Sequence, residues 1–132
     1  MVELTPEGLA AELRRRQKMI HDSMARKMET AALNVETVAK KYCTPGESPY
    51  EGGGKLRGAP FDTGLMRANI GHDVVDLKID IIGRVGNPIA YALPVHEGTS
   101  KMQGRPFITD AIRDERPRTD AILGSAVSEG CR

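Results

Sequence analysis

The sequence predicts an α+β fold in which a long N-terminal helix precedes a small antiparallel sheet and a C-terminal helix packs on that sheet. Three observations predict it: apolar residues recur at helical spacing over residues 5–41, alternate over residues 69–86, and return to helical spacing after Pro106. A chain of 132 residues suffices for one modest core, so we expect a single domain over residues 1–132.

The first element is a helix from about Thr5 to Lys41. Thr5 can cap it, Pro6 is tolerated at its first position, and Glu7 favours the positive end of its dipole. Its apolar stripe comprises Leu9, Leu13, Ile20, Met24, Met28, Ala31, Val35, Val38 and Tyr42. At 1.5 Å per residue the helix would be ~55 Å long, more than a domain of this size can cover. We therefore expect either a bend or a second subunit against part of the stripe.

Residues 43–61 are rich in glycine and proline and show no periodicity, so they predict a flexible surface loop. The glycines at 52–54 lack the Lys-Ser/Thr pair of a phosphate-binding loop, which favours simple flexibility. Asp62 or Thr63 is then expected to cap a short helical turn through Leu65 to Arg67.

Two strands are expected in "NIGHDVVDL" and "KIDIIGRVG", joined as an antiparallel hairpin around Asp76 to Lys78. Pro88 ends the second strand. Tyr91, Leu93 and Val95 then alternate with other residues, and Pro94 restricts this piece to an edge strand or an irregular turn.

The C-terminal helical region opens at Arg105-Pro106. Its apolar patch at helical spacing comprises Phe107, Ile108, Ala111 and Ile112. Pro117 is expected to break the helix, with a second short turn or helix from Asp120 to Val127. Residues 128–132 are expected to be a disordered tail.

Composition and charge exclude several classes of function. The formal net charge is +1 with mixed signs, and the one basic run, Arg14 to Lys18, is best explained as a solvated helix face. No apolar run is long enough for a bilayer, and no secretion signal precedes the first helix, so we expect synthesis in a cytoplasm. Cys43 and Cys131 are expected to be free thiols, and we expect neither a metal nor a cofactor.

Reactive residue types gather in "AYALPVHEGTSKMQGRPF", residues 90–107. In an extended segment His96 and Glu97 would point to opposite faces, so they are not expected to cooperate. "HEGTS" lacks the second histidine of a zinc protease motif, and Thr99 and Ser100 lack a nucleophile elbow. We therefore interpret the stretch as a shaped docking element and expect no enzyme. The less favoured alternatives are a small hydrolase using His96 and Glu97 and a nucleic-acid-binding module using Arg14 to Lys18.

Three blocks in order, "PFDTGLMRANI", "VGNPIAYALPVHEGTS" and "KMQGRPFITDAI", carry a resemblance. They resemble a family of small tail-component proteins of long-tailed bacteriophages, typified by gene product ten of HK-97-type phages, which includes tail-completion and head–tail joining proteins. The matching positions are Asp62, Thr63, Gly64, Met66, Arg67, Tyr91, Ala92, His96, Glu97, Gly98, Thr99, Met102, Arg105, Pro106 and Phe107. The chain departs from the family pattern at Pro94 and at Gly104, where the family usually has alanine.

The resemblance spans about residues 9 to 127 and implies a tail-terminator or neck protein of the virion, assembled in the host cytoplasm. Such a protein would form a ring, expected to be a hexamer, on the major tail-tube protein. It would dock to the head connector or stopper protein, and DNA would pass through its lumen without sequence-specific binding. A stopper at another level of the neck is the alternative.

A ring uses two different surfaces of each subunit. The long apolar stripe is one expected surface, and the loop of residues 94–106 is the other, with Glu97, Lys101 and Arg105 selecting the partner by charge. The expected interface residues are Asp62, Thr63, Arg67, Tyr91, His96, Glu97, Thr99, Lys101, Met102, Arg105 and Phe107.

Overall fold

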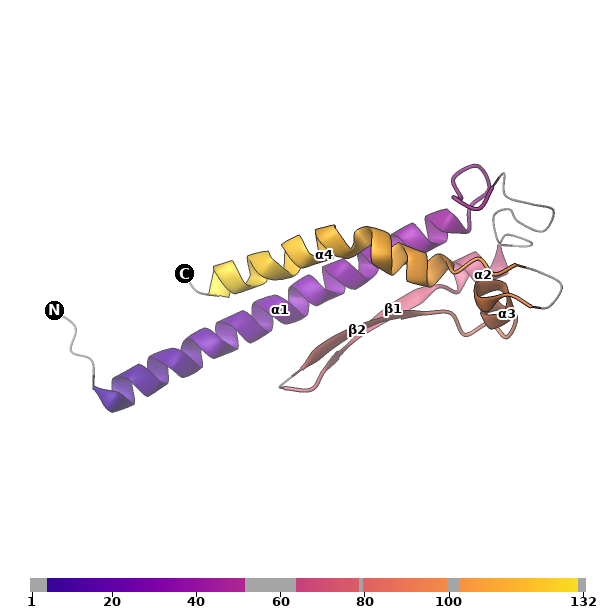
Figure 1. The fold of residues 1–132 in the computed structure, drawn as a ribbon. Helices are drawn as coiled ribbons and strands as arrows, with labels where there is room; N and C mark the ends of the chain where they lie inside the picture. The colour runs from indigo at the N-terminus through magenta and orange to yellow at the C-terminus, as the bar shows by residue number, and fades with distance from the viewer. Residues whose placement is uncertain (1–4, 52–63, 79, 100–102, 131–132) are drawn as a thin grey trace.

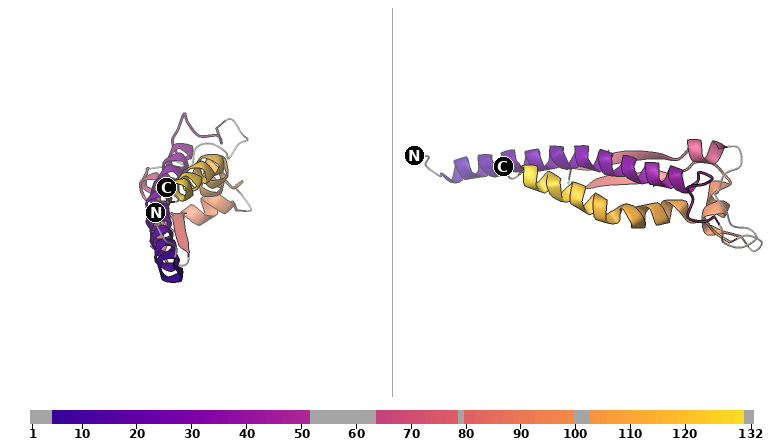
Figure 2. Two further views of the ribbon diagram at one scale, coloured as in Figure 1. Left: turned by 90° about the vertical axis from the view of Figure 1, so that its left-hand side faces the viewer. Right: turned by 90° about the horizontal axis from the view of Figure 1, so that it is seen from above.

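Figure 1 shows the computed structural model, which describes residues 5–51, 64–78, 80–99 and 103–130. Its elements are α1 (Pro6–Tyr42), α2 (Leu65–Ala68), β1 (Gly71–Asp76), β2 (Ile81–Gly86), α3 (Ala92–Glu97) and α4 (Phe107–Gly130). The helices α1 and α4 run antiparallel and pack along each other, and the β1–β2 hairpin packs on α1 (Figures 1 and 2). The predicted α+β fold class is confirmed.

The helix α1 begins and ends almost where the sequence predicts. The Thr5 hydroxyl oxygen accepts a hydrogen bond from the Gly8 N–H at 3.0 Å, which satisfies one of the free donors of the first turn. The helix is continuous over 37 residues, but its buried positions begin only at Ser23. We call residues 6–22 the arm, and its first turns extend past the end of α4 (Figure 1).

The largest cluster of buried residues lies at the opposite end of α1 from the arm. It joins the end of α1 to the start of α4 through α2 and α3, and its members are Val35, Ala39, Cys43, Tyr50, Met66, Ile70, Ala92, Phe107 and Ala111. We call this end the head and define it as residues 43–51, 64–70, 87–99 and 103–111. The sequence blocks that carry the family resemblance converge here, as far as their residues are described (Figure 1).

Residues 43–51 contribute to this core, contrary to the expectation that the loop has little to bury. The Tyr50 side chain is buried, and its hydroxyl donates to Asp110 Oδ2 at 2.6 Å. It also meets the Tyr42 ring edge-on at a centroid distance of 6.4 Å. Burial and the Asp110 carboxylate both raise the pKa of Tyr50, so the phenol stays a donor. Residues 52–61 of the expected loop lie outside the described residues.

The predicted hairpin is confirmed, with a register from Gly71 opposite Gly86 to Asp76 opposite Ile81. A close approach to α1 explains a glycine in β2: a Cβ on Gly83 would lie 2.9 Å from Met28 Sδ. Before the hairpin, α2 starts from Gly64 at its cap position, with φ of 81°. Asp62 and Thr63, the expected caps, lie outside the described residues.

Residues 92–97 form a helix, so the expected edge strand or irregular turn is wrong. Pro94 is the third residue of α3. Backbone N–H groups in the first turn of a helix have no helical partner, so a proline loses nothing there. Alternation of Tyr91, Leu93 and Val95 was therefore a misleading signal over so short a segment.

The helix α4 continues through Pro117 to Gly130, so the expected break and the expected disordered tail over residues 128–130 are both wrong. Packing along α1 offsets the cost of the proline. At the far end, Ser23 Oγ donates to Glu129 Oε2 at 3.1 Å and Lys27 Nζ lies 3.4 Å from Glu129 Oε1. These contacts fasten the last turns of α4 to α1.

Replacement of the exposed Pro117 with alanine is expected to stabilise the protein by about 1–2 kcal/mol. Alanine restores a backbone donor inside α4, and the greater freedom of the unfolded chain removes part of that gain. Chemical denaturation followed by circular dichroism measures it. Pro106→Ala is the control: Pro106 precedes the helix, so the same change there should give no gain. A loss of stability on Pro117→Ala would mean that the backbone at this position depends on the proline.

Candidate functional site

The structure places the described members of the expected interface in the head. Arg67 lies on α2, Tyr91 precedes α3, and Thr99 and Arg105 flank the return from α3 to α4. Asp62, Thr63, Lys101 and Met102 lie outside the described residues, so their expected contacts are not tested.

Phe107 has no exposed surface in the subunit and belongs to its core, so its expected contact with a partner stays a prediction without visible surface behind it. Its ring packs edge-on against the His96 imidazole at a centroid distance of 5.4 Å. The apolar surface that the head offers instead is Leu93 of α3, which is 67% exposed, with Tyr91 beside it at 43%. Leu93 is missing from the expected interface, because the sequence predicts an extended segment here and the structure has a helix.

His96 and Glu97 do contact each other, so the expectation that they cannot cooperate is also wrong. His96 Nδ1 lies 2.7 Å from Glu97 Oε1, because the chain is helical here and Glu97 ends α3. On its other side, His96 Nε2 lies 3.4 Å from the Thr109 backbone N and 3.2 Å from Thr109 Oγ1. A carboxylate only accepts hydrogen bonds, so Nδ1–H donates to Glu97 Oε1, and Nε2 of the neutral ring accepts from the Thr109 N–H.

Glu97, His96 and Thr109 thus contact one another in the carboxylate–imidazole–hydroxyl order that is found in hydrolase triads. Two features favour a fastening role for it. The Thr109 N–H is one of the free donors at the start of α4, and His96 satisfies it. The Glu97 carboxylate is 65% exposed, so it would orient and stabilise an imidazolium only weakly. His96 thus ties α3 to the first turn of α4.

The return from α3 to α4 is tightly folded. Gly98 has φ of 92°, and it forms an isolated antiparallel bridge with Gln103. The Arg105 N–H donates to the Val95 oxygen at 2.9 Å. A Cβ on Gly104 would lie 2.7 Å from the carbonyl carbon and oxygen of Glu97. The docking element predicted over residues 94–106 therefore has a defined outline at its described residues.

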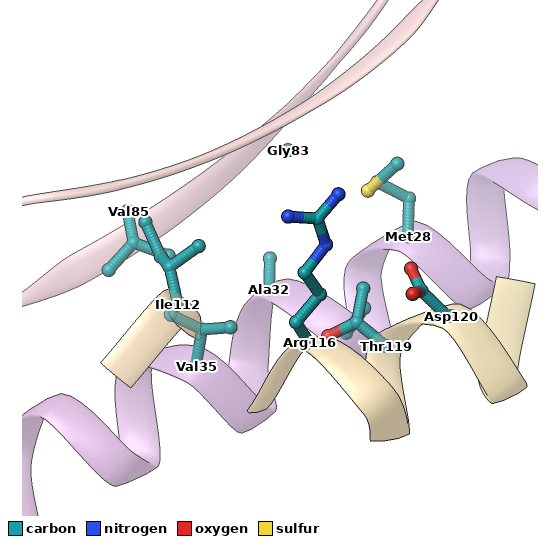
Figure 3. Close-up of a pocket in the computed structure, with 10 residues that line it drawn as sticks. Met28, Ala32, Val35, Gly83, Val85, Ile112, Arg116, Thr119 and Asp120 are labelled. Atoms are coloured by element: carbon teal, nitrogen blue, oxygen red, sulfur yellow. The ribbon is translucent and has the colours of Figure 1, made fainter. Parts of the chain in front are cut away.

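A groove that the sequence did not predict runs between α1, β2 and α4 (Figure 3). Its volume is about 320 Å³, and its lining residues are Met28, Ala31, Ala32, Val35, Gly83, Val85, Ile112, Arg116, Thr119 and Asp120. The floor is apolar, and the polar side chains come from α4, with Arg116 extending toward the hairpin in Figure 3. The sequence signal for this groove would have been three small residues: the adjacent alanines at 31 and 32 of α1 and the glycine at 83 of β2.

The arm presents a second uncovered apolar surface. Leu9 is 46% exposed and Leu13 is 58% exposed, although both belong to the stripe that is buried further along α1. The basic run on the arm is partly neutralised. Glu12 Oε1 lies 2.6 Å from Arg15 Nη2 and 2.9 Å from Arg16 Nε, and these hydrogen bonds lower the pKa of Glu12 to about 2. The arrangement agrees with a solvated face.

Other chemistry is sparse in the described ranges. Cys43 is a free thiol in the core, and burial raises its pKa to about 12, so it is a poor nucleophile; Cys131 lies outside these ranges. Over the same ranges, no three His, Cys, Asp or Glu side chains are grouped so as to hold a metal ion. Nor does any helix described here have the length and apolarity needed to cross a bilayer.

Comparison with family models, with curated proteins and with solved structures found no significant match to this chain.

Proposed function

We propose that this chain is a structural virion subunit that assembles with copies of itself into a ring, and that the ring completes the tail of a long-tailed phage. The observation that carries self-assembly is the uncovered stripe of the arm, with Leu9 and Leu13 exposed on an otherwise regular amphipathic helix. Apolar side chains repeated along one helix face favour burial against a partner. The resemblance of the three sequence blocks supports the phage assignment.

A ring needs head-to-tail contacts between two different surfaces. The arm and the head lie at opposite ends of α1, which suits such contacts (Figure 1). In this proposal the arm contributes apolar area between subunits. The exposed head residues Tyr91, Leu93 and Glu97 contact the tail-tube protein or the head connector, and Glu97 and Arg105 add charge selection. Terminator and stopper levels of the neck differ in which of these partners binds.

The double variant Leu9→Glu, Leu13→Glu is expected to abolish self-association. Full burial of an exposed leucine contributes about 1.5–3 kcal/mol, and each of these two is about half exposed, so losing both weakens association by at least roughly 10-fold, and the cost of burying two carboxylates adds to this. Light scattering of the purified chain gives the mass of the assembly, and negative-stain images with and without tail-tube protein reveal rings.

The matched control is Ala11→Glu, which adds charge to the same arm at an exposed position on the opposite face of the helix from Leu9 and Leu13. It should assemble as the unaltered chain does, with both variants keeping their helical signal. If the unaltered chain stayed a single copy even with tail-tube protein present, the proposed function would be contradicted. If the double variant assembled normally, the arm would not be the contact.

A further inference from the structure

The β1–β2 hairpin is fastened to α1 by two histidine–carboxylate bridges. On β1, His72 Nε2 lies 2.6 Å from Glu29 Oε1, and His72 Nδ1 lies 2.5 Å from Glu36 Oε2. Nearer the hairpin turn, His21 Nε2 of α1 lies 2.8 Å from Asp76 Oδ2. Glu29 and Glu36 are seven residues apart and so share one face of α1. The His72 imidazole therefore sits between two carboxylates.

This geometry has a direct consequence for the protonation state of His72. A carboxylate only accepts hydrogen bonds, and a neutral imidazole carries a single N–H. Neutral His72 could satisfy one of the two glutamates but would turn a lone pair toward the other. Only the imidazolium donates to both. The site is also sheltered, since the His72 and Glu36 side chains are 16% and 12% exposed.

The charges around His72 come from three elements. From α1, Lys40 Nζ lies 3.0 Å from Glu36 Oε1, so Glu36 is shared between a lysine and the histidine. From β1, Asp73 adjoins His72 and pairs with Arg84 of β2, whose Nε donates to Asp73 Oδ1 at 2.8 Å. Hydrogen bonds to Glu29 and then Glu36 raise the pKa of His72. Burial raises the pKa of Glu36, but the hydrogen bonds from His72 and Lys40 together lower it.

We propose that His72 is a pH-operated latch that seats the β1–β2 hairpin on α1 in weakly acidic solution and loosens it as the solution becomes alkaline. The hairpin forms one wall of the groove between α1, β2 and α4, so the latch also sets how widely that groove opens (Figure 3). This inference concerns the single subunit and does not rest on the proposed ring.

The sign follows from the direction of each shift. The pKa of His72 is raised above its ordinary value of 6.5, so its contribution is fully present below about pH 6.5 and is lost as pH rises through the raised value. The pKa of Glu36 is lowered from 4.5, so its contribution is present above about pH 4.5 and is lost only as pH falls through the lowered value. The latch is thus closed at pH values between the lowered pKa of Glu36 and the raised pKa of His72.

Hydrogen exchange of the full chain tests the latch. The readout is the protection of β1 and β2 amides relative to α1 core amides such as that of Ala39, each corrected for its intrinsic rate, at about pH 6 and about pH 9. Each unit by which the contacts raise the pKa favours the seated hairpin about tenfold. We therefore expect relative hairpin protection to be lower at about pH 9 than at about pH 6.

Two variants make the test specific. Both are made in a His21→Gln background, which removes the second histidine bridge. There His72→Gln should remove the pH dependence, whereas His96→Gln, which alters a histidine of the head, should keep it. Glu29→Gln changes a carboxylate that is 58% exposed and so should fold, and an NMR titration of His72 should then show a lower pKa than in the unaltered chain. Equal relative protection at both pH values would overturn the proposal, as would a pH dependence that survives His72→Gln or an unchanged His72 titration in Glu29→Gln.

Discussion

Phe107→Ala is expected to destabilise the protein by about 3–5 kcal/mol, because it empties the largest fully buried side chain of the head. The ring packs against His96 and lies in the cluster that joins α1, α2, α3 and α4. A cavity there cannot close without moving several elements at once. Chemical denaturation followed by circular dichroism measures the loss.

The matched control is Ile112→Ala on the same helix. Ile112 is 50% exposed, so its truncation should cost well under half as much. The comparison also separates the two roles considered for Phe107. Weakened assembly with an unchanged denaturation midpoint would return Phe107 to a partner interface and contradict its place in the core.

Gly104→Ala is expected to cost about 1–3 kcal/mol, since the added methyl group would collide with backbone and not with a flexible side chain. The new Cβ would lie 2.7 Å from the Glu97 carbonyl and 2.9 Å from the His96 oxygen. Either α3 or the return to α4 must shift.

Gly124→Ala is the control for Gly104→Ala. Gly124 lies within α4, and a Cβ built there meets nothing within 4 Å. The same chemical change should therefore stabilise the protein by about 0.5–1 kcal/mol through helix propensity. Thermal denaturation of the two variants should shift the midpoint in opposite directions. A midpoint unaffected by Gly104→Ala would contradict the close packing of residues 97 and 104.

The parts of the fold that sequence could predict are those governed by local rules. The Thr5 cap and the uninterrupted apolar stripe specify α1, and alternation with a short connection specifies the hairpin. The predictions for the two proline-containing segments were wrong because a residue's place in the helix, or its packing, overrides its local preference. Pro94 occupies a first turn that tolerates it, and Pro117 is held in a helix by contacts with α1.

Contacts that define the candidate sites could not be predicted from the sequence, because they join residues that lie far apart in the chain. The burial of Tyr50 depends on Asp110, which is 60 residues away in the chain. The bridge at His72 likewise joins residues 36 and 43 positions apart. Such pairings become visible only when the elements are placed in space. Two glutamates seven residues apart on α1 were the only local trace of the bridge.

Because α1 begins and α4 ends at the same end of the molecule, the two chain termini offer handles for choosing its orientation on a support (Figure 1). A subunit anchored to a sensor chip through its last residues would hold Leu93 and its neighbours outward, while crowding Leu9 and Leu13 against the matrix. Candidate partner proteins that are injected over the chip would then reach only the head end of the subunit.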